Sequence, residues 1–412
     1  MPLLTKYNPL PSGLRWATLT LRKNARCAVT QPHKNRPTWL PKILAGIFGI
    51  GVALGMIALL LALFPRFNPN NITFTVGMGD ILFYQTAWLP PLDNANEVLS
   101  VHPITWDADG FRLPRRPAES YPIIALGDSF TESANSAIPW PDVLAEALGT
   151  PVRNLGFRGF GPLDEAETFK RYGSDEAVQT VIIGFFEGND MSNAVTFQER
   201  GYIPPSETED FNLIQADMDS VSERDIRYPM QVDLNGTLHD IVFLEGYVWQ
   251  LNGLYGAYER SSNLDLIAQS WDDIRKAAPP DSCVIVAYFP DKSHVYLPFL
   301  TAEDRPILMQ KATRTVAKEG RALTSREPEE ADRNFDVLLE RLGNQRDAVA
   351  DRAASEGFRF VDMTPILRDA ASQGQMLYYT YDTHWNQDGH NRVGTALANY
   401  LKVNPCDVPA TS

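Results

Sequence analysis

The chain has 412 residues, of which 44% are hydrophobic and 21% charged, so it can bury a sizeable core and is not a disordered protein. Its net charge of −14 is unevenly distributed. The first 79 residues carry nine Lys or Arg and no Asp or Glu, whereas the remainder carries 28 basic and 51 acidic side chains. Because phosphate groups bind to basic surfaces, the acidic part is not expected to bind nucleic acid.

The N-terminal region predicts a membrane anchor. Residues 1–42 are basic and proline-rich, which indicates a cytoplasmic tail. Residues 43–64 are 22 consecutive uncharged residues, and a helix rising about 1.5 Å per residue would cross a bilayer core of roughly 30 Å. Eight of the nine basic residues precede it. The positive-inside rule therefore predicts a single-pass membrane protein whose main domain is periplasmic or extracellular. A cleaved signal peptide is the alternative, with an unusually long leader and apolar run.

Beyond the anchor, residues 68–118 hold short β-like runs broken by Pro, Asn and Gly, typical of a small β-rich region. From 119 to 405, apolar β-branched runs alternate with helical periods, which predicts a three-layer α/β/α domain around a mainly parallel sheet. Residues 191–262 interrupt the alternation and are interpreted as an insertion near the site. The expected strands are 122–126, 152–156, 179–185, 283–289 and 358–363, and the expected helices are 140–149, 163–173, 266–278, 334–357 and 387–401.

Polar blocks follow the predicted strands and should meet at one edge of the sheet. Ser129 lies in GDSFT, Gly159 in GFRGFG and Asn189 in GND, while Asp382 and His384 lie in YDTHW. A serine hydroxyl is a weak nucleophile until a base takes its proton. We predict His384 as that base and Asp382 as the residue that orients it. The backbone N–H groups of Ser129 and Gly159 and the side-chain amide of Asn189 are predicted to form an oxyanion hole.

Each block alone has a structural explanation. Ser129 could simply begin a helix, Gly159 could lie in a turn and Asn189 could be a cap. Gly156 is the second candidate for the oxyanion glycine, and Asp128 is expected to cap the helix that follows it. The joint order and strand-end placement of the blocks favour a catalytic set.

In this order the blocks resemble the SGNH (GDSL) hydrolase superfamily, with 30 residues from Ser129 to Gly159 and 30 from Gly159 to Asn189. The segment 107–112 looks like the membrane-linked branch of this superfamily. The DTHW block and the segment 290–296 are similar to proteins that O-acetylate alginate and other exported polysaccharides. The Asp–His gap of two residues is also typical of those proteins. The pair follows the serine, however, as in ordinary SGNH hydrolases.

The resemblance implies a flavodoxin-like fold and an O-acyl, in particular O-acetyl, esterase or acyltransferase that forms an acyl-serine. It implies an acylated carbohydrate or polysaccharide as substrate and an integral membrane acyl-donor protein as partner. No nucleotide-binding or zinc-protease motif occurs, so no cofactor or metal is expected. The alternatives are a non-catalytic glycan-binding or assembly factor on the same scaffold, or a lipid esterase.

Two further features lie outside this set. His294, next to Asp291 and Lys292, is expected on a solvated loop, with a substrate contact as the alternative. Cys283 falls in an apolar run and is expected to be a buried small residue. Whether it pairs with Cys406 is left open.

Overall fold

The computed structural model describes nine ranges of the chain, all within one compact unit, Leu61–Ser412. The ranges are 76–77, 80–81, 102–103, 105–133, 136–175, 177–207, 230–310, 328–380 and 383–406. None of the helices in these ranges is long and apolar enough to cross a membrane. The predicted anchor at 43–64 lies outside them.

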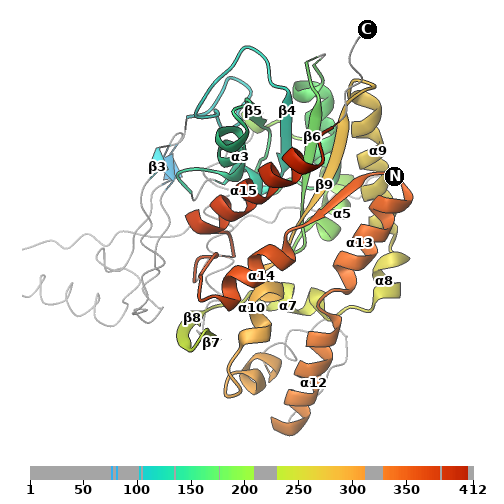
Figure 1. The fold of residues 1–412 in the computed structure, drawn as a ribbon. Coiled ribbons are helices and arrows are strands. Elements are labelled where there is room, and N and C mark those ends of the chain that lie inside the picture. Colours follow the sequence, from blue (N-terminus) through green and yellow to red (C-terminus); the bar gives the residue numbers. More distant parts are fainter. Residues whose placement is uncertain are drawn as a thin grey trace, which may run out of the picture. The chain divides into compact units, whose positions relative to one another are not determined.

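A sheet of five parallel strands forms the centre of the domain (Figure 1). The strands lie in the order β10-β9-β6-β4-β5, which is the flavodoxin-like order. After β4 the chain adds β5 on one side of it, and then returns to add β6, β9 and β10 on the other side. The register pairs Gly127 with Gly184 and Gly184 with Ala287, so β4, β6 and β9 end at the same edge. The strands are β4 (Ile123–Gly127), β5 (Val152–Asn154), β6 (Thr180–Phe186), β9 (Cys283–Phe289) and β10 (Arg359–Asp362).

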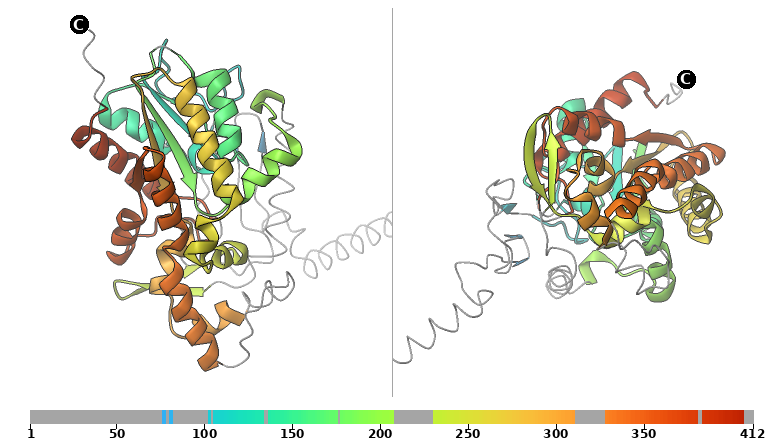
Figure 2. Two further views of the ribbon diagram at one scale, coloured as in Figure 1. Left: turned by 90° about the vertical axis from the view of Figure 1, so that its right-hand side faces the viewer. Right: turned by 90° about the horizontal axis from the view of Figure 1, so that it is seen from below.

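Helices cover both faces of this sheet, so the domain has three layers, α/β/α (Figure 2). Successive strand residues point to opposite faces. In β4, Ile123 and Ala125 therefore join one core cluster, while Ile124 and Leu126 join the other. The first face carries α3 (Trp140–Leu148), α14 (Thr364–Ser372) and α15 (Gln387–Val403). The second carries α4 (Pro162–Thr168), its π-helical extension Phe169–Gly173, α9 (Ser262–Ala277) and α13 (Asn344–Ser355).

A two-stranded antiparallel hairpin lies in the long connection between β6 and β9. Its turn uses Asn235 and Gly236, both with positive φ, which matches the twist of two-residue hairpins. Other short elements are α2 (Ser129–Glu132), α5 (Asp190–Arg200), Pro205–Glu207, β7 (Met230–Leu234), β8 (Thr237–Ile241), α7 (Glu245–Leu251), α8 (Tyr255–Glu259), α10 (Lys292–Tyr296) and Leu297–Phe299. A small antiparallel sheet joins β1 (Val76–Gly77), β2 (Asp80–Ile81) and β3 (His102–Pro103).

The expected helix at 334–357 is wrong, because the structure divides it in two. One helix, α12 (Pro328–Arg341), ends before Gly343, and α13 begins at Asn344. Phe335 of α12 is buried in the core on one side of the sheet, whereas Val349 of α13 is buried on the other. A straight helix could not bury both side chains, and the glycine weakens the helix where the direction changes.

The segment 290–296 is not the solvated loop that the sequence predicts. It contains all of α10 (Lys292–Tyr296) and its N-cap Asp291, and Lys292 and His294 are each only 1% exposed. Cys283 is not a simple buried thiol either, because it forms a disulfide with Cys406, at a Cα–Cα distance of 5.6 Å. The bond links the start of β9 to the chain just after α15.

Candidate active site

Ser129 stands at the carboxyl edge of the sheet, directly after β4. Gly127 ends the strand with φ +151°, and an added Cβ there would collide with Thr131. Asp128 then caps α2, with its Oδ1 accepting a hydrogen bond from the Phe130 N–H at 2.9 Å. Ser129 is therefore the first residue of a one-turn helix, where its hydroxyl faces the edge at which parallel α/β sheets bind ligands.

His384 meets this serine. Its Nε2 lies 2.7 Å from Ser129 Oγ, within the hydrogen-bonding distance that general-base catalysis requires. The imidazole ring centroid lies 4.8 Å from that of Phe130. The next residue, Trp385, is fully buried and pairs with Tyr378 in a β-bridge just before α15. These contacts fix the histidine directly before the bridge residue and the long helix that follows it.

Asp382, predicted to orient His384, lies outside the described residues. The residues on either side of it are anchored. Thr380 accepts a hydrogen bond on its carbonyl oxygen from Lys292 Nζ at 3.0 Å, and Thr383 Oγ1 donates to Asp291 Oδ2 at 3.2 Å.

The three predicted oxyanion donors also lie at strand ends. Gly159 has φ +73° and open space around its Cα, as a loop glycine lining a site would have. Within the described ranges, the N–H groups of Ser129 and Gly159 have no hydrogen-bond acceptor. Asn189 uses one amide hydrogen, donating to Asp128 Oδ2 at 3.2 Å, and its Nδ2 carries a second.

Gly156, the second candidate for the oxyanion glycine, has another role. Its N–H donates to Asn154 Oδ1 at 2.9 Å and is therefore occupied. A Cβ at this position would lie 2.5 Å from Thr131 Cβ and 2.6 Å from the Glu132 backbone nitrogen. Gly156 thus allows the β5 loop to pack tightly against α2.

Asp128, which precedes Ser129, is buried close enough to Glu165 and Asp190 for the charges of these carboxyl groups to interact. Burial raises the pKa of Asp128 to about 6, while hydrogen bonds from the Phe130 N–H and the Asn189 amide and the charge of His384 oppose the rise. Burial and mutual repulsion raise the pKa of Glu165 and of Asp190 well above the ordinary value. No group of His, Cys, Asp or Glu in the described ranges is arranged to hold a metal ion.

Comparison with known families finds a match in the C-terminal part of the chain. Residues 315–409, which include His384, match the family described as SGNH hydrolase-like domain, acetyltransferase AlgX. Over these residues the chain is similar to SGNH hydrolase-like proteins. No match was found among curated protein sequences.

Among solved structures, the chain is similar to an extracellular lipase from Streptomyces rimosus, at 14% identity and a TM-score of 0.38, over 68% of this chain and 99% of the lipase. It is also similar to phospholipase A1 from Streptomyces albidoflavus, at 11% identity and a TM-score of 0.37, over 67% and 97%. A member of the lipolytic G-D-S-L family from Veillonella parvula matches at 11% identity and a TM-score of 0.33, over 69% and 98%.

The domain contains a second serine–histidine pair that the sequence does not reveal. Ser133 Oγ lies 2.7 Å from His390 Nε2. Both side chains are buried, and burial lowers the pKa of His390 well below its ordinary value. A substrate cannot reach this pair, so it serves to fasten the end of α2 to α15. The two residues are 257 positions apart, so only the tertiary structure shows that they meet.

An ion pair joins the nucleophile helix to the oxyanion loop. Glu132 is fully buried, and its carboxylate accepts hydrogen bonds from the Arg158 backbone N–H at 3.1 Å and from Arg158 Nε at 2.9 Å. The Arg158 guanidinium also lies 5.2 Å from the centroid of the Trp106 ring. The residue before Gly159 is therefore fixed to the helix that begins with Ser129. Sequence reasoning missed this pair.

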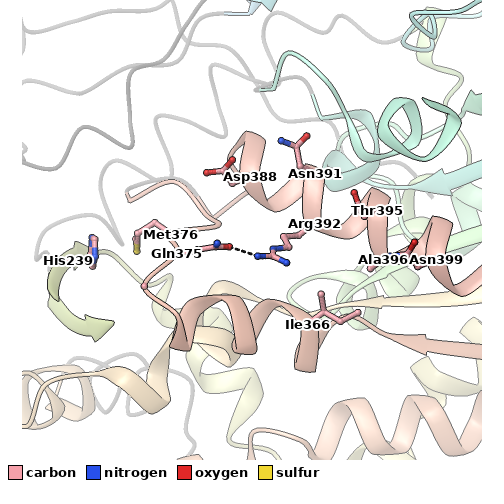
Figure 3. Close-up of a pocket in the computed structure, with 11 residues that line it drawn as sticks. His239, Ile366, Gln375, Met376, Asp388, Asn391, Arg392, Thr395, Ala396 and Asn399 are labelled. Carbon is pink, nitrogen blue, oxygen red and sulfur yellow. Dashed lines mark hydrogen bonds between the residues drawn. The ribbon is translucent and has the colours of Figure 1, made fainter. Parts of the chain in front are cut away.

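A groove of about 960 Å³ lies elsewhere on the domain (Figure 3). Polar residues of α15 line one side of it, and Arg392 donates to Gln375 Oε1 at 2.9 Å across it. Ser129, Gly159, Asn189 and His384 are not among its lining residues. The groove is therefore separate from the candidate active site.

Proposed function

We propose that this protein is a serine-dependent O-acyl esterase or acyltransferase that acts on extracytoplasmic carbohydrate through an acyl-serine intermediate. The observation that carries the proposal is the 2.7 Å contact between Ser129 Oγ and His384 Nε2 at the carboxyl edge of the sheet. Acyl transfer requires a serine within hydrogen-bonding distance of a base, beside backbone N–H groups that can bind an oxyanion. Among the described residues, the N–H groups of Ser129 and Gly159 have no acceptor and can take this role.

The proposed reaction has two halves. In the first, Ser129 Oγ attacks the acyl carbonyl carbon while its proton passes to His384 Nε2. The carbonyl oxygen becomes an oxyanion facing the N–H groups of Ser129 and Gly159 and the amide of Asn189. Collapse breaks the ester bond, and His384 returns the proton to the leaving oxygen. In the second half, water or a sugar hydroxyl gives its proton to His384 and attacks the acyl carbonyl carbon. The bond between this carbon and Ser129 Oγ breaks, and His384 returns the proton to Ser129 Oγ.

The chemical class of the substrate is proposed from the family match. The matching family is described as acetyltransferase AlgX, which favours acetyl as the acyl group. The resemblance of DTHW and of the segment 290–296 to proteins that O-acetylate exported polysaccharides supports a polysaccharide as substrate or acceptor. Hydrolysis and transfer use the same residues and differ in whether water or a glycan hydroxyl reaches the acyl-serine. The uncharged segment 43–64 and the basic residues before it support a membrane-anchored enzyme that faces away from the cytoplasm. An integral membrane acyl-donor protein is the corresponding partner.

The test uses the full-length protein in detergent and a fluorophosphonate probe, followed by intact mass. We expect one adduct on the wild type and none on Ser129→Ala or His384→Ala. Ser133→Ala is the matched control, because Ser133 also lies 2.7 Å from a histidine but is buried, and this variant should keep one adduct. A folded wild type without an adduct would favour the non-catalytic glycan-binding alternative. With labelling established, acetate release from acetylated polysaccharide and from lipid esters would separate the two substrate classes.

A further inference from the structure

The first turn of α10 is not used by the reaction described above, yet it is among the most buried polar parts of the domain. Asp291 caps the helix by accepting a hydrogen bond from the Ser293 N–H at 2.8 Å. Asp291 and Lys292 are each 1% exposed. Burying a charged side chain costs free energy unless its polar atoms are hydrogen-bonded. The hydrogen-bond partners of Asp291 and Lys292 therefore indicate what these two residues do.

Both residues bind the segment that carries His384. Lys292 Nζ donates to the carbonyl oxygens of Tyr379 at 3.1 Å and of Thr380 at 3.0 Å. Asp291 Oδ2 accepts from Thr383 Oγ1 at 3.2 Å. The contacts lie on both sides of positions 381–382. The last of them is one residue before His384.

The same turn is joined to the strand end that carries Asn189. Glu187 lies two residues before Asn189 and is buried. Its Oε2 accepts from the Asp291 backbone N–H at 2.8 Å, and its Oε1 lies 2.8 Å from His294 Nδ1. Tyr288 completes the cluster by donating its hydroxyl to Glu187 Oε1 at 2.6 Å. The start of α10 therefore connects the oxyanion side of the site with the histidine side.

The choice of lysine has a physical reason. Two consecutive carbonyl oxygens point at the same buried position, and their dipoles favour a cation there. Lys292 offers three N–H donors on a long stem, so it can reach them from another element. An apolar residue of the same length would fill the space but leave buried carbonyl oxygens without this donor.

We propose that Lys292 is a positioning residue for the catalytic histidine. Its ammonium group holds the segment 379–384 so that His384 Nε2 meets Ser129 Oγ. The kinetic readout rests on the proposed function, whereas the positioning itself can be measured without any activity.

The experiment compares wild type and Lys292→Met in the full-length protein in detergent. Hydrogen exchange should rise in the peptide 377–386 and stay unchanged in strands β4 and β6. The kcat for an aryl acetate should fall by about 100-fold with an unchanged KM, because a displacement of about 1 Å costs this much and the binding of the acyl group is not altered. In a His384→Ala background, Lys292→Met should cause no further loss.

Ile274→Ala is the matched control for general destabilisation. Ile274 is fully buried in the last turn of α9, which leads to β9 at the amino edge of the sheet, opposite Ser129. This variant should lower Tm but leave both kcat and the exchange of 377–386 as in wild type. If Lys292→Met does not fold, Thr383→Val decides, because it removes the bond to Asp291 from a partly exposed side chain. Thr383→Val should raise the hydrogen exchange of 377–386 and lower kcat, each by less than Lys292→Met does.

The outcomes separate the two proposals. A wild type that neither labels nor hydrolyses contradicts the proposed function, and the exchange of 377–386 still decides the role of Lys292. Unchanged exchange in a folded Lys292→Met variant overturns the positioning role. A loss of kcat that is equally large in the His384→Ala background also overturns it, because Lys292 would then act independently of the histidine.

Discussion

Asp128 holds two of the proposed catalytic groups with its two carboxylate oxygens. Oδ1 accepts from the Phe130 N–H and so fixes the helix that starts at Ser129, while Oδ2 accepts from the Asn189 amide. Asp128 is fully buried, and its burial raises its pKa to about 6. This residue therefore positions the proposed nucleophile and one proposed oxyanion donor.

Asp128→Asn should separate activity from stability. Asparagine has one acceptor oxygen where aspartate has two. Its side chain can therefore replace the hydrogen bond to the Phe130 N–H or the one to the Asn189 amide, but not both. We expect kcat to fall by about 100-fold, the usual effect of losing an oxyanion donor, with no loss of thermal stability. Glu165→Gln is the control, because it also removes a buried carboxylate and has no contact with Asn189. Equal kcat for Asp128→Asn and wild type would show that Asn189 does not need this partner.

The buried acids also predict how stability depends on pH. A carboxyl whose pKa is raised by folding binds its proton more tightly in the folded state, so the free energy of unfolding falls as pH rises through this range. For Asp128 the range is from the ordinary value of 3.8 to about 6. The pKa of Glu165 is also raised, so the free energy of unfolding continues to fall at higher pH. Urea unfolding of Glu165→Gln should show higher stability than wild type at neutral pH and a smaller difference at pH 4. A difference that grows at low pH would contradict this sign.

At the level of elements, α2 is a single turn and depends on others for support. Arg112 is buried, with its pKa lowered to about 10 by burial. Its guanidinium donates to the carbonyl oxygens of Glu132 at 3.2 Å, Ser136 at 2.9 Å and Ala137 at 3.0 Å. These bonds close the loop after α2, and Ser133 and His390 fasten it to α15.

Arg112→Met should therefore loosen the nucleophile helix. Several buried carbonyl oxygens lose their donor, and we expect the free energy of unfolding to fall by about 3 kcal/mol. The kcat should fall as well, because Ser129 would be held less firmly. Arg392→Met is the matched control, since Arg392 is exposed and its replacement should change stability by less than about 0.5 kcal/mol. Indistinguishable urea midpoints for the two variants would argue against this role of Arg112.

The sequence predicts the elements that depend on local pattern and misses those set by tertiary contact. The apolar runs locate β4, β6 and β9 within a residue or two, because parallel strands buried on both faces are apolar throughout. The break at Gly343 was missed, since it depends on which side of the sheet each half is buried. Lys292 was placed in solvent for the same reason, because nothing near it in the sequence reveals its carbonyl partners.

The candidate site shows the same division. Strand ends and block order suffice to predict that Ser129, Gly159, Asn189 and His384 gather at one edge. The choice of Gly159 over Gly156 needs the structure, which shows the Gly156 N–H bound to Asn154. Asp382 stays a prediction.

On the scale of the whole domain, the Cys283–Cys406 disulfide closes a loop of 123 residues. That loop contains α10, α14 and α15, and with them both the Lys292 turn and His384. In the chain-entropy account, a cross-link over this length stabilises the folded state by about 5 kcal/mol. The oxidising environment that such a bond requires agrees with the proposed location outside the cytoplasm.

Cys283→Ser should lower the free energy of unfolding by up to about 5 kcal/mol under non-reducing conditions. Cys27→Ser, which leaves this pair intact, should have no effect. Peptide mapping without reductant should recover the linked peptides from wild type and from Cys27→Ser. Recovery of Cys283 and Cys406 as free thiols from oxidised protein would contradict the assignment.

The most direct test of the central claim is to trap the acyl-enzyme. Full-length protein is mixed with an activated acetate ester, quenched in acid within the burst phase, and digested for peptide mass spectrometry. The account predicts acetyl on Ser129 in the wild type and none in His384→Ala. Turnover without acetyl on Ser129, or acetyl on Ser129 at equal rates with and without His384, would contradict it.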